Sequence, residues 1–285
     1  MENEQMKGRL YVVATPLGNL EDITLRARRV LGEVALVLCE DTRRTAKLLK
    51  VNNIDVPTLS FHEHNAKRRT PQVLRHLSAG DELALVSDAG TPTISDPGAA
   101  LVMTLRREGH VVIPIPGPSA VATALSVSGL PADRYVFRGF LPGRAGERRR
   151  ALVELTDVTE TLVFFESPRR IRATLADLEQ ILGDRSAFVC REATKRHEEY
   201  AAGTLAELAR SFADRDVKGE ITLVVAGASG EPRPSDAPVE QLFEELRGQG
   251  LTRRAAAKET ARRTGGKARE IYARMLANGG GDDSG

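Results

Sequence analysis

Short apolar runs alternate with helical patterns along the first part of the chain. The apolar runs occupy residues 9–14, 34–39, 57–61, 82–87 and 110–115. Between them, apolar residues recur at helical spacing in residues 24–34, 42–50, 70–80 and 98–109. Strands that are apolar on both faces are typical of a parallel sheet covered by helices on both sides. We therefore expect an N-terminal α/β domain with a mostly parallel sheet over residues 1–117.

The pattern changes after the segment "IPGPSAVATALSVSGLP". A second set of apolar runs occupies residues 134–140, 161–167, 186–192, 198–203 and 220–227, with helical patterns at 146–155, 168–182 and 204–213. Some of these runs follow each other closely, as "CREATKRHEEYAAG" shows, which favours antiparallel pairing. The spacing predicts a second α/β domain over residues 118–230 with a mixed sheet.

The last part of the chain has a different composition. Residues 227–238 are rich in Gly, Pro and Ser, as in a linker. We expect residues 231–285 to hold the linker and a small helical extension of three short helices, interrupted at "GQGLT" and "TGG". Thr252 is the expected N-cap of the second of these helices. The closing "GGGDDSG" is expected to be disordered.

Composition limits the classes of protein that fit. In the 285 residues no apolar run approaches the roughly 18–20 residues that a membrane span needs, and the N-terminus lacks the pattern of a secretory signal. Cys39 and Cys190 both lie in apolar runs, so we expect buried thiols without a disulfide in a cytoplasmic protein. The net charge is only +2, and a nucleic-acid surface would therefore require local clusters of cations.

Stiff loops follow several of the predicted strands in the first domain. They read "ATPLGNLEDIT" (14–24), "SDAGTPTISDPG" (87–98) and "PIPGPSA" (114–120). In parallel α/β sheets, ligands bind outside the carboxyl ends of the strands, where these loops would lie. Neither G-x-G-x-x-G nor G-x-x-x-x-G-K-[ST] occurs in the chain, which disfavours the common dinucleotide and P-loop sites. One such loop could be an ordinary tight turn; several at one sheet edge predict a ligand site.

Clusters of cations lie near the same predicted edge. Candidates for contact with the phosphates of RNA are Arg43, Arg44, Lys67, Arg68, Arg69, Arg148, Arg149, Arg169 and Arg170. An ordinary solvated charged surface explains any single cluster equally well. The "HEH" at residues 62–64 lacks an evident third ligand, and we predict no metal site there.

Several long segments together resemble the tetrapyrrole-methylase superfamily. They are "LYVVATPLGNLEDITLRA", "SDAGTPTISDPG", "PIPGPSAVATALSVSGLP", "FFESPRR" and "CREATKRHEE". The resemblance covers residues 9–226 and is closest to the branch that methylates small-subunit ribosomal RNA, whose helix-turn-helix-like extension the tail also resembles. It implies two α/β domains with S-adenosylmethionine in the cleft between them. It further implies methylation of a cytidine ribose 2′-hydroxyl in 16S ribosomal RNA, the small ribosomal subunit as partner, and a homodimer.

The resemblance also implies which residues hold S-adenosylmethionine. Matched residue by residue, they are Pro16, Gly18, Asp88, Gly90, Thr91, Pro92, Ile94, Ser119, Ala120, Phe165, Glu166, Ala193 and Leu223. The chain departs from the superfamily in two loops. "TPLGN" lacks the usual glycine-rich first loop, and Thr91 replaces the acid of the usual Gly-Asp-Pro.

A ribose hydroxyl is a weak nucleophile, so a positioned base would accelerate methyl transfer. The candidates are Asp88, Glu40, Asp41, His62, Glu166 and Glu192, with Glu166 and Asp88 ranked first because they lie in matched motifs. Two other functions stay open: a methyltransferase for a tetrapyrrole or other small acceptor, and a non-catalytic RNA-binding factor in ribosome assembly. The cationic clusters disfavour the first alternative, and the loops at one sheet edge disfavour the second.

Overall fold

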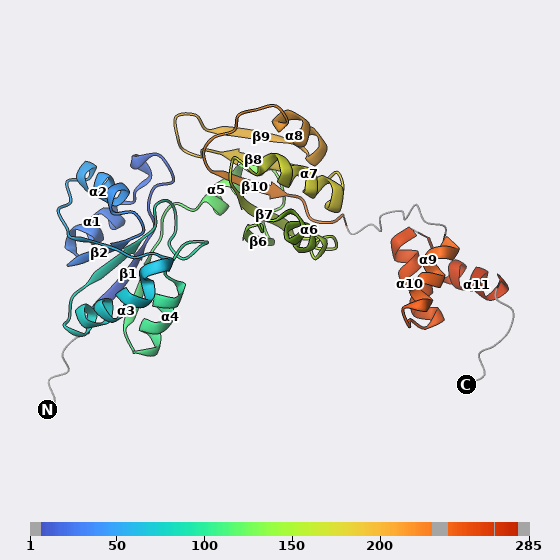
Figure 1. Ribbon diagram of the computed structural model, residues 1–285, viewed down its shortest axis with the longest axis horizontal. Helices are drawn as coiled ribbons and strands as arrows, with labels where there is room; N and C mark the ends of the chain where they lie inside the picture. The colour runs from blue at the N-terminus through green and yellow to red at the C-terminus, as the bar shows by residue number, and fades with distance from the viewer. Residues whose placement is uncertain (1–6, 230–238, 265, 279–285) are drawn as a thin grey trace. The chain divides into compact units, whose positions relative to one another are not determined.

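The computed structural model describes residues 7–229, 239–264 and 266–278. The chain divides into two compact units, of which the first extends to Ala226 and the second comprises Asp157–Thr159 and the residues from Gly227 (Figure 1). Most of the predicted linker and the "GGGDDSG" tail lie outside the described residues. The boundary expected between residues 117 and 118 falls within the first unit and stays a prediction.

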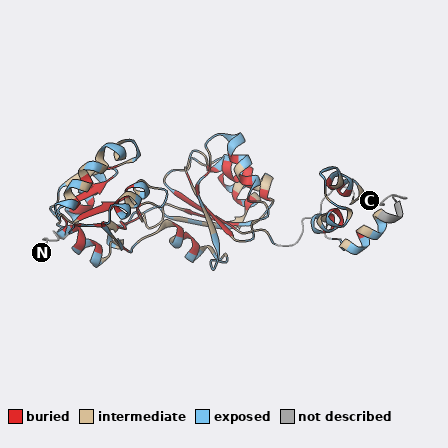
Figure 2. Ribbon diagram, turned by 90° about the horizontal axis from the view of Figure 1, so that it is seen from below, coloured by how far each residue is buried: buried red, intermediate tan, exposed pale blue. Residues whose placement is uncertain are grey.

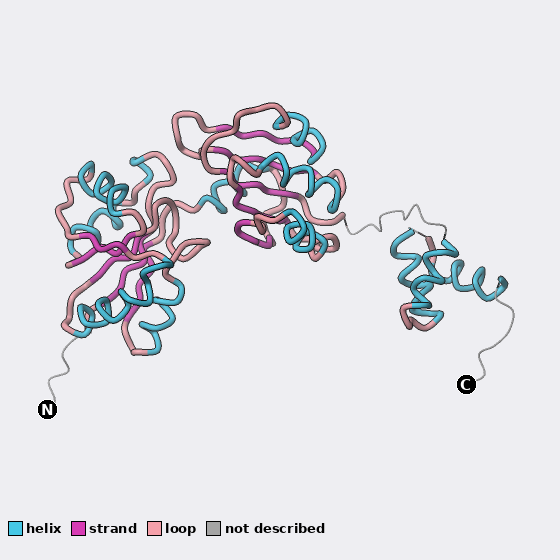
Figure 3. The backbone as a smooth tube through the Cα atoms, in the orientation of Figure 1, coloured by secondary structure: helices cyan, strands magenta, loops and turns pink. Residues whose placement is uncertain are grey.

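A parallel sheet of five strands forms the N-terminal half of the first unit (Figure 3). Its strands are β1 (Arg9–Val13), β2 (Leu36–Cys39), β3 (Thr58–Ser60), β4 (Leu83–Val86) and β5 (Val111–Ile115). They follow the order β3-β2-β4-β1-β5, and every pairing is parallel, which confirms the predicted sheet. Pro114, which cannot donate a ladder hydrogen bond, lies on the edge strand β5.

Helices cover both faces of this sheet, and both faces are buried (Figure 2). The helical elements of this half are η1 (Leu20–Asp22), α1 (Leu25–Glu33), α2 (Thr42–Val51), α3 (Glu63–Ser78) and α4 (Ala99–Arg107). Along β2, Val37 and Cys39 pack with residues of α1 and α2, whereas Leu36 and Leu38 pack with residues of α3 and α4. Successive side chains of a strand point to opposite faces, so a sheet covered twice needs uninterrupted apolar strands.

Helix α3 begins one to two turns earlier than the apolar pattern predicts. The backbone N–H of His62 donates to Asn65 Oδ1 at 2.9 Å, and Asn65 Nδ2 donates to the Ser60 carbonyl at 3.2 Å. These bonds tie the first turn to the end of β3. The helix then continues through Pro71, which the sequence would favour near a helix start.

A mixed sheet of five strands forms the second half of the first unit. Its strands are β6 (Tyr135–Phe140), β7 (Thr161–Glu166), β8 (Ser186–Arg191), β9 (Glu199–Thr204) and β10 (Ile221–Val225). The order is β6-β7-β10-β8-β9, with β6 and β7 parallel and the remaining pairs antiparallel. The prediction of a mixed sheet is thus confirmed.

The helices of this half are α5 (Ala120–Ser128), α6 (Ala145–Val153), α7 (Ile171–Leu182) and α8 (Leu205–Phe212). The sequence pattern did not predict α5, which has no polar stripe. Ser119 caps it by accepting from the Ala122 N–H, and Gly129 ends it with a φ of 71°. Its residues Val121, Ala124 and Leu125 pack against the second sheet, so α5 carries the chain from the first sheet to the second.

The second unit contains the three predicted helices. They are α9 (Val239–Gly248), α10 (Arg253–Thr264) and α11 (Ala268–Asn278), and they share a small apolar core that includes Phe243, Ala257 and Ile271. The Ala255 N–H donates to Thr252 Oγ1 at 3.3 Å, which confirms Thr252 as the N-cap. Cys39 and Cys190 are buried free thiols, as expected. No helix within the described ranges is both long and apolar enough to cross a membrane.

Candidate functional site

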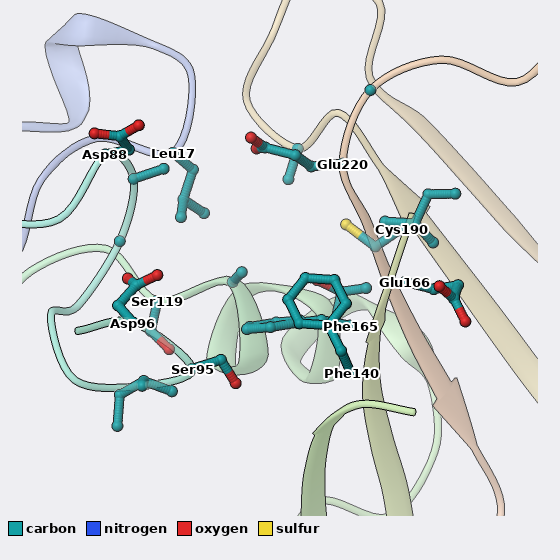
Figure 4. A pocket seen from close by; sticks show the side chains of 18 of the residues that line it. Leu17, Asp88, Ser95, Asp96, Ser119, Phe140, Phe165, Glu166, Cys190 and Glu220 are labelled. Carbon is teal, nitrogen blue, oxygen red and sulfur yellow. The ribbon is translucent and has the colours of Figure 1, made fainter. Parts of the chain in front are cut away.

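A cavity of about 310 Å³ opens where loops of the two sheets meet (Figure 4). One wall consists of Leu17 after β1, residues 88–91 and 94–96 after β4, and the start of α5. The other wall consists of the end of β6, residues 165–168 at the end of β7 and just after it, Cys190 and Ala193, and residues 219–222 just before β10 and at its start. The parallel sheet thus presents its loops at the edge that the sequence predicted.

Backbone hydrogen bonds lock the loops of the first wall to one another. Thr15 and Gly90 exchange two N–H···O=C bonds of 2.9 and 3.0 Å, and the Thr15 hydroxyl donates to the Ser87 carbonyl at 3.1 Å. The Thr91 hydroxyl donates to the Pro118 carbonyl at 3.1 Å. Gly90 has a φ of 80°, a conformation that costs glycine little and other residues more. The wall is therefore preorganised before any ligand arrives.

Most residues that the resemblance implied as cofactor contacts line this cavity. They are Asp88, Gly90, Thr91, Ile94, Ser119, Ala120, Phe165, Glu166 and Ala193. Pro16, Gly18, Pro92 and Leu223 do not line it. Pro16 and Pro92 are buried inside their loops, and exposed Gly18 lies against Lys195, whose Cγ would be 2.1 Å from an added Cβ.

Leu223 is replaced in the cavity by its neighbour Thr222. In the register of the sheet, Thr222 lies opposite Phe165 and Cys190, both of which line the cavity, whereas Leu223 lies opposite Phe164 and Val189. Side chains alternate between the faces of a strand, so an offset of one residue moves a side chain to the other face. Leu223 is fully buried within the second half of the first unit.

Several lining residues were not predicted from sequence. They are Leu17, Ala89, Ser95, Asp96, Phe140, Ser167, Pro168, Cys190, Gly219, Glu220, Ile221 and Thr222. Many of them are direct neighbours of matched residues in the sequence, and a prediction that included the residues on either side of each match would have found them. Cys190 is chemically quiet, because burial raises the pKa of its thiol to about 11.

The Glu166 carboxylate lies inside the second half of the first unit, and Figure 4 shows it turned away from the cavity. It is fully buried and accepts hydrogen bonds from the Thr174 hydroxyl at 2.6 Å and the Ser167 N–H at 2.7 Å. Arg170 forms an ion pair with it at 3.0 Å. A carboxylate with this many donors has little capacity to accept a substrate proton. The geometry therefore argues against Glu166 as the base.

Asp88 is also engaged in local structure. Its carboxylate accepts the Asp41 N–H at 3.1 Å and lies 3.3 Å from the Arg44 guanidinium. Two further candidates are ion-paired. The Arg43 side chain lowers the pKa of Asp41 to about 2. For Glu192, burial raises the pKa, but hydrogen bonds from Lys195 and the Glu220 N–H outweigh it and lower the pKa overall.

Asp96 has a different electrostatic environment. Burial is the main cause that raises its pKa from 3.8 to about 6; a hydrogen bond with Ser87 opposes the shift. The negative charges of Glu40, Asp88 and Glu220 add to the increase. Glu40 and Glu220 are distant in sequence, and only the fold brings them near this loop. A carboxyl group with a pKa near neutrality in a cavity is typical of functional sites.

The predicted RNA-contacting cations differ in their availability. Lys67, Arg68 and Arg169 are exposed; Arg43, Arg44 and Arg149 are exposed but ion-paired to Asp41, Asp88 and Asp177. Arg69 is half-buried and donates to Gln72. Arg170 is bound to Glu166 and to the Leu141 carbonyl. The His62 and His64 rings lie edge to face, 5.9 Å apart, and the described residues form no cluster of three or more metal-binding side chains.

Arg148 is buried, which contradicts its prediction as an RNA contact. Its side chain is 6% exposed, and two of its nitrogens lie 2.6 and 2.7 Å from the Asp177 carboxylate. The turn of α6 points Arg148 toward α7, while neighbouring Arg149 stays 56% exposed and also reaches Asp177. In this "RRR" segment only position 148 points inward, which sequence alone does not show.

The paired arginines allow a matched test of stability. Arg148→Met should lower the free energy of unfolding by about 2 kcal/mol, because it removes a buried cation from Asp177 while Arg149 still pairs with that carboxylate. Arg149→Met should cost less than about 1 kcal/mol, because water screens an exposed pair. Urea denaturation at pH 7 measures both. Equal losses would contradict a specific structural role for Arg148.

The lining of the cavity fits a cationic ligand with an aromatic or apolar part. The carboxylates of Asp88, Asp96 and Glu220 line it, and no lysine or arginine is among the described residues that do. Leu17, Ile94, Phe140, Phe165 and Ile221 supply apolar surface. Its volume is in the range of small-molecule and cofactor sites. S-adenosylmethionine, with a sulfonium, an ammonium group and an adenine, has the matching chemistry.

Comparison with known proteins agrees with these features. The family model described as Tetrapyrrole (Corrin/Porphyrin) Methylases matches residues 9–209. A Synechocystis protein named Ribosomal RNA small subunit methyltransferase I is 46% identical over 93% of this chain and 96% of its own length. A Thermotoga maritima protein of the same name is 49% identical over 77% of this chain and 99% of its own.

A solved structure shares the fold. Uroporphyrin-III C-methyltransferase from Thermus thermophilus, complexed with S-adenyl homocysteine, superposes with a TM-score of 0.56 at 22% identity. The match covers 76% of this chain and 97% of that one. At this identity the similarity shows the fold, and the arrangement of two α/β lobes is therefore common to both proteins.

Proposed function

The chain belongs to the tetrapyrrole (corrin/porphyrin) methylase family, and on that premise we propose that it transfers the methyl group of S-adenosylmethionine to a cytidine ribose 2′-hydroxyl in small-subunit ribosomal RNA. The observation that carries the proposal is the cavity lined by Asp88, Asp96 and Glu220 without a lysine or arginine among its described residues. It is suited to a ligand with a net positive charge.

The residues of the chain have two tasks in this reaction. S-adenosylmethionine, when bound, supplies an electrophilic methyl group on a sulfonium. The loops locked by the Thr15–Gly90 and Thr91–Pro118 hydrogen bonds would hold it in one orientation. Apolar side chains, among them Phe140 and Phe165, would exclude water. Orientation matters most, because the attacking oxygen must align with the bond that breaks.

An RNA acceptor is favoured over a small one. The relatives that the chain matches over nearly their full length are named for small-subunit ribosomal RNA. Exposed Arg43, Lys67 and Arg68 lie at the carboxyl edge of the first sheet, where they could bind phosphates. Only an unpaired nucleotide could enter, which favours a non-helical region of the RNA.

Titration calorimetry with S-adenosylmethionine tests the cofactor cavity. We expect Ala120→Trp to weaken binding at least 100-fold, because Ala120 lines the cavity and the new ring would fill it. Ala122→Trp places the same ring two residues along α5 at an exposed position and should bind as the wild type does. Binding by neither the wild type nor the control would overturn the methyltransferase assignment and favour an assembly factor.

Methylation of ribosomes tests the acceptor. Small subunits from cells that lack this protein, incubated with it and S-adenosylmethionine, should gain 2′-O-methylcytidine in their RNA, as measured by mass spectrometry of nucleosides. Subunits incubated with Ala120→Trp should not. Methyl transfer to uroporphyrinogen III without transfer to ribosomal RNA would contradict the proposal and support the small-acceptor alternative.

We also propose that the protein acts in the cytoplasm as a homodimer. Ribosomal subunits are available as substrates there, and closed symmetric dimers are the commonest oligomers of soluble proteins. Light scattering coupled to gel filtration measures the mass in solution. A value near the 30.9 kDa of one chain would contradict the dimer.

A further inference from the structure

A second, larger cavity adjoins the first. It has a volume of about 1010 Å³ and lies at the carboxyl ends of β2, β3 and β4. Residues 40–43 after β2, residues 60–66 around the start of α3, and residues 95–100 before and within α4 contribute to its lining. Asp88, Ser95 and Asp96 line both cavities. The segment after β4 is thus the common wall, and its side chains border a group bound in either cavity.

The charges in this second cavity favour a nucleoside over a phosphate. Its lining includes the carboxylates of Glu40, Asp41, Glu63, Asp88 and Asp96. Carboxylates repel phosphates but accept hydrogen bonds from ribose hydroxyls and from the exocyclic amino group of cytosine. The cations lie at its margin: Arg43 lines the cavity and is exposed, and exposed Lys67 and Arg68 follow on α3. An acidic interior with a cationic margin matches an extruded nucleotide, with its sugar and base inside and its phosphates outside.

We propose that this second cavity binds the acceptor nucleoside of the RNA and that Asp96 is the catalytic base that accepts the proton of its 2′-hydroxyl. The inference rests on the proposed function and adds the acceptor subsite and the base to it. The bond from the ribose oxygen to the methyl carbon forms as the bond from that carbon to sulfur breaks. The hydroxyl proton passes to the Asp96 carboxylate, and the sulfur leaves as a neutral thioether.

Asp96 is favoured over the other acids because it lines both cavities and forms no ion pair with a cation. Glu166 is saturated by donors inside the lobe, and Asp41 lies on the second cavity alone and is bound to Arg43. Glu220 lies on the first cavity alone, 3.0 Å from Lys195 Nζ. Asp88 shares the common wall but is tied to Arg44 and the Asp41 N–H. Of the two described carboxylates that line both cavities, Asp96 is the one that forms no ion pair.

The surroundings of Asp96 make it a stronger base than an ordinary aspartate. Its pKa of about 6 leaves it ionised at pH 7–8, while it binds a proton more tightly than a carboxylate with a pKa of 3.8. The charged and titratable groups around it are Glu40, Asp88 and Glu220, with Arg43, Arg44, His62, Glu63 and His64 on or beside the second cavity. The nearby carboxylates thus contribute to its basicity.

Single-turnover methylation of small subunits tests Asp96. Asp96→Asn should lower the rate constant at least 100-fold at pH 8, because the amide cannot accept the proton. Its dissociation constant for S-adenosylmethionine should rise by a much smaller factor than the rate constant falls, because one of the three carboxylates that line the cofactor cavity loses its charge. The wild-type rate should rise with pH through about 6 and then level, and the residual rate of Asp96→Asn should lose this step. Asp133→Asn, which removes an exposed carboxylate outside both cavities, is the control.

The outcomes separate this inference from the function on which it rests. A wild type that binds S-adenosylmethionine but methylates no ribosomal RNA would refute the proposed function itself. If the wild type methylates RNA and Asp96→Asn does so at a comparable rate, the role of Asp96 as the base is refuted, but the proposed function is not. If the affinity of Asp96→Asn for S-adenosylmethionine falls by the same factor as its rate constant, Asp96 is a cofactor contact, and its role as the base is again refuted.

Filling the second cavity tests the acceptor subsite independently. Ala100→Trp, on the first turn of α4, should abolish methylation of small subunits while S-adenosylmethionine still binds as to the wild type. Met103→Trp, at a 49% exposed position on the same helix that does not line the cavity, should remain active. Normal methylation by Ala100→Trp would show that the nucleoside binds elsewhere.

Discussion

Replacing Glu166 by alanine is expected to destabilise the protein by about 3–5 kcal/mol, without implicating it in chemistry. The change removes the acceptor for Arg170, the Thr174 hydroxyl and the Ser167 N–H in one step. Breaking a buried pair by removing one partner leaves the other charge uncompensated, which accounts for the size of the loss. Such a loss is a large part of the 5–15 kcal/mol that typically holds a domain folded. Urea denaturation at pH 7 measures it.

Two further variants separate this structural role from catalysis. Glu154→Ala removes a glutamate that is 71% exposed and 3.5 Å from Arg138, and it should cost less than about 1 kcal/mol. Glu166→Gln keeps the shape of the side chain and its hydrogen bonds to Thr174 and Arg170, so it should lower the free energy of unfolding by less than Glu166→Ala does. If the folded fraction of Glu166→Gln lost methyl transfer 100-fold at full S-adenosylmethionine occupancy, Glu166 would act in catalysis and our interpretation would be wrong.

The strands could be predicted because burial on both faces leaves a direct record in the sequence. "VALVLC" and "ELALVS" contain almost no polar residue, and both became central strands of the parallel sheet. Helix α5 left no comparable record. "AVATALSVS" is apolar nearly all round and follows a proline-rich loop, so neither the period nor the composition distinguished it from a strand or a loop.

The candidate site was predictable as a set of loops but not as a set of side chains. The loops after β1 and β4 could be placed from the order of strands alone. Which of two neighbours faces the cavity depends on the register, and this decided between Thr222 and Leu223. Arg148 shows the same limit on a helix, where the turn of α6 buried one cation of an otherwise exposed run.

Asp96 was missed because its chemistry is a property of the fold. In sequence it is one aspartate in "TISDPG", and nothing local distinguishes it from Asp88. Its raised pKa depends on burial and on the charges of Glu40 and Glu220, which lie 56 residues before it and 124 after it. Such an arrangement can be recognised only when the strands that carry these residues have been placed. It also has an energetic consequence for the folded state.

Asp96→Asn is expected to stabilise the protein at pH 8 by about 1–2 kcal/mol even though it should abolish methyl transfer. A pKa of about 6 in the folded state against 3.8 in the unfolded state means that ionising Asp96 opposes folding, by at most roughly 1.4 kcal/mol per unit of difference and by less for a half-buried carboxyl group that water screens. The penalty is complete above about pH 6, diminishes as the pH falls through that value, and is absent below 3.8. Urea denaturation of wild type and variant should therefore differ at pH 8 but by only about 0.5 kcal/mol at pH 4. Asp133→Asn, exposed and outside both cavities, should show no such change with pH. A gain in the free energy of unfolding that did not depend on pH would mean that the charge of Asp96 costs no stability. A gain that shrinks as the pH falls would show that the protein gives up stability at the residue that the reaction needs.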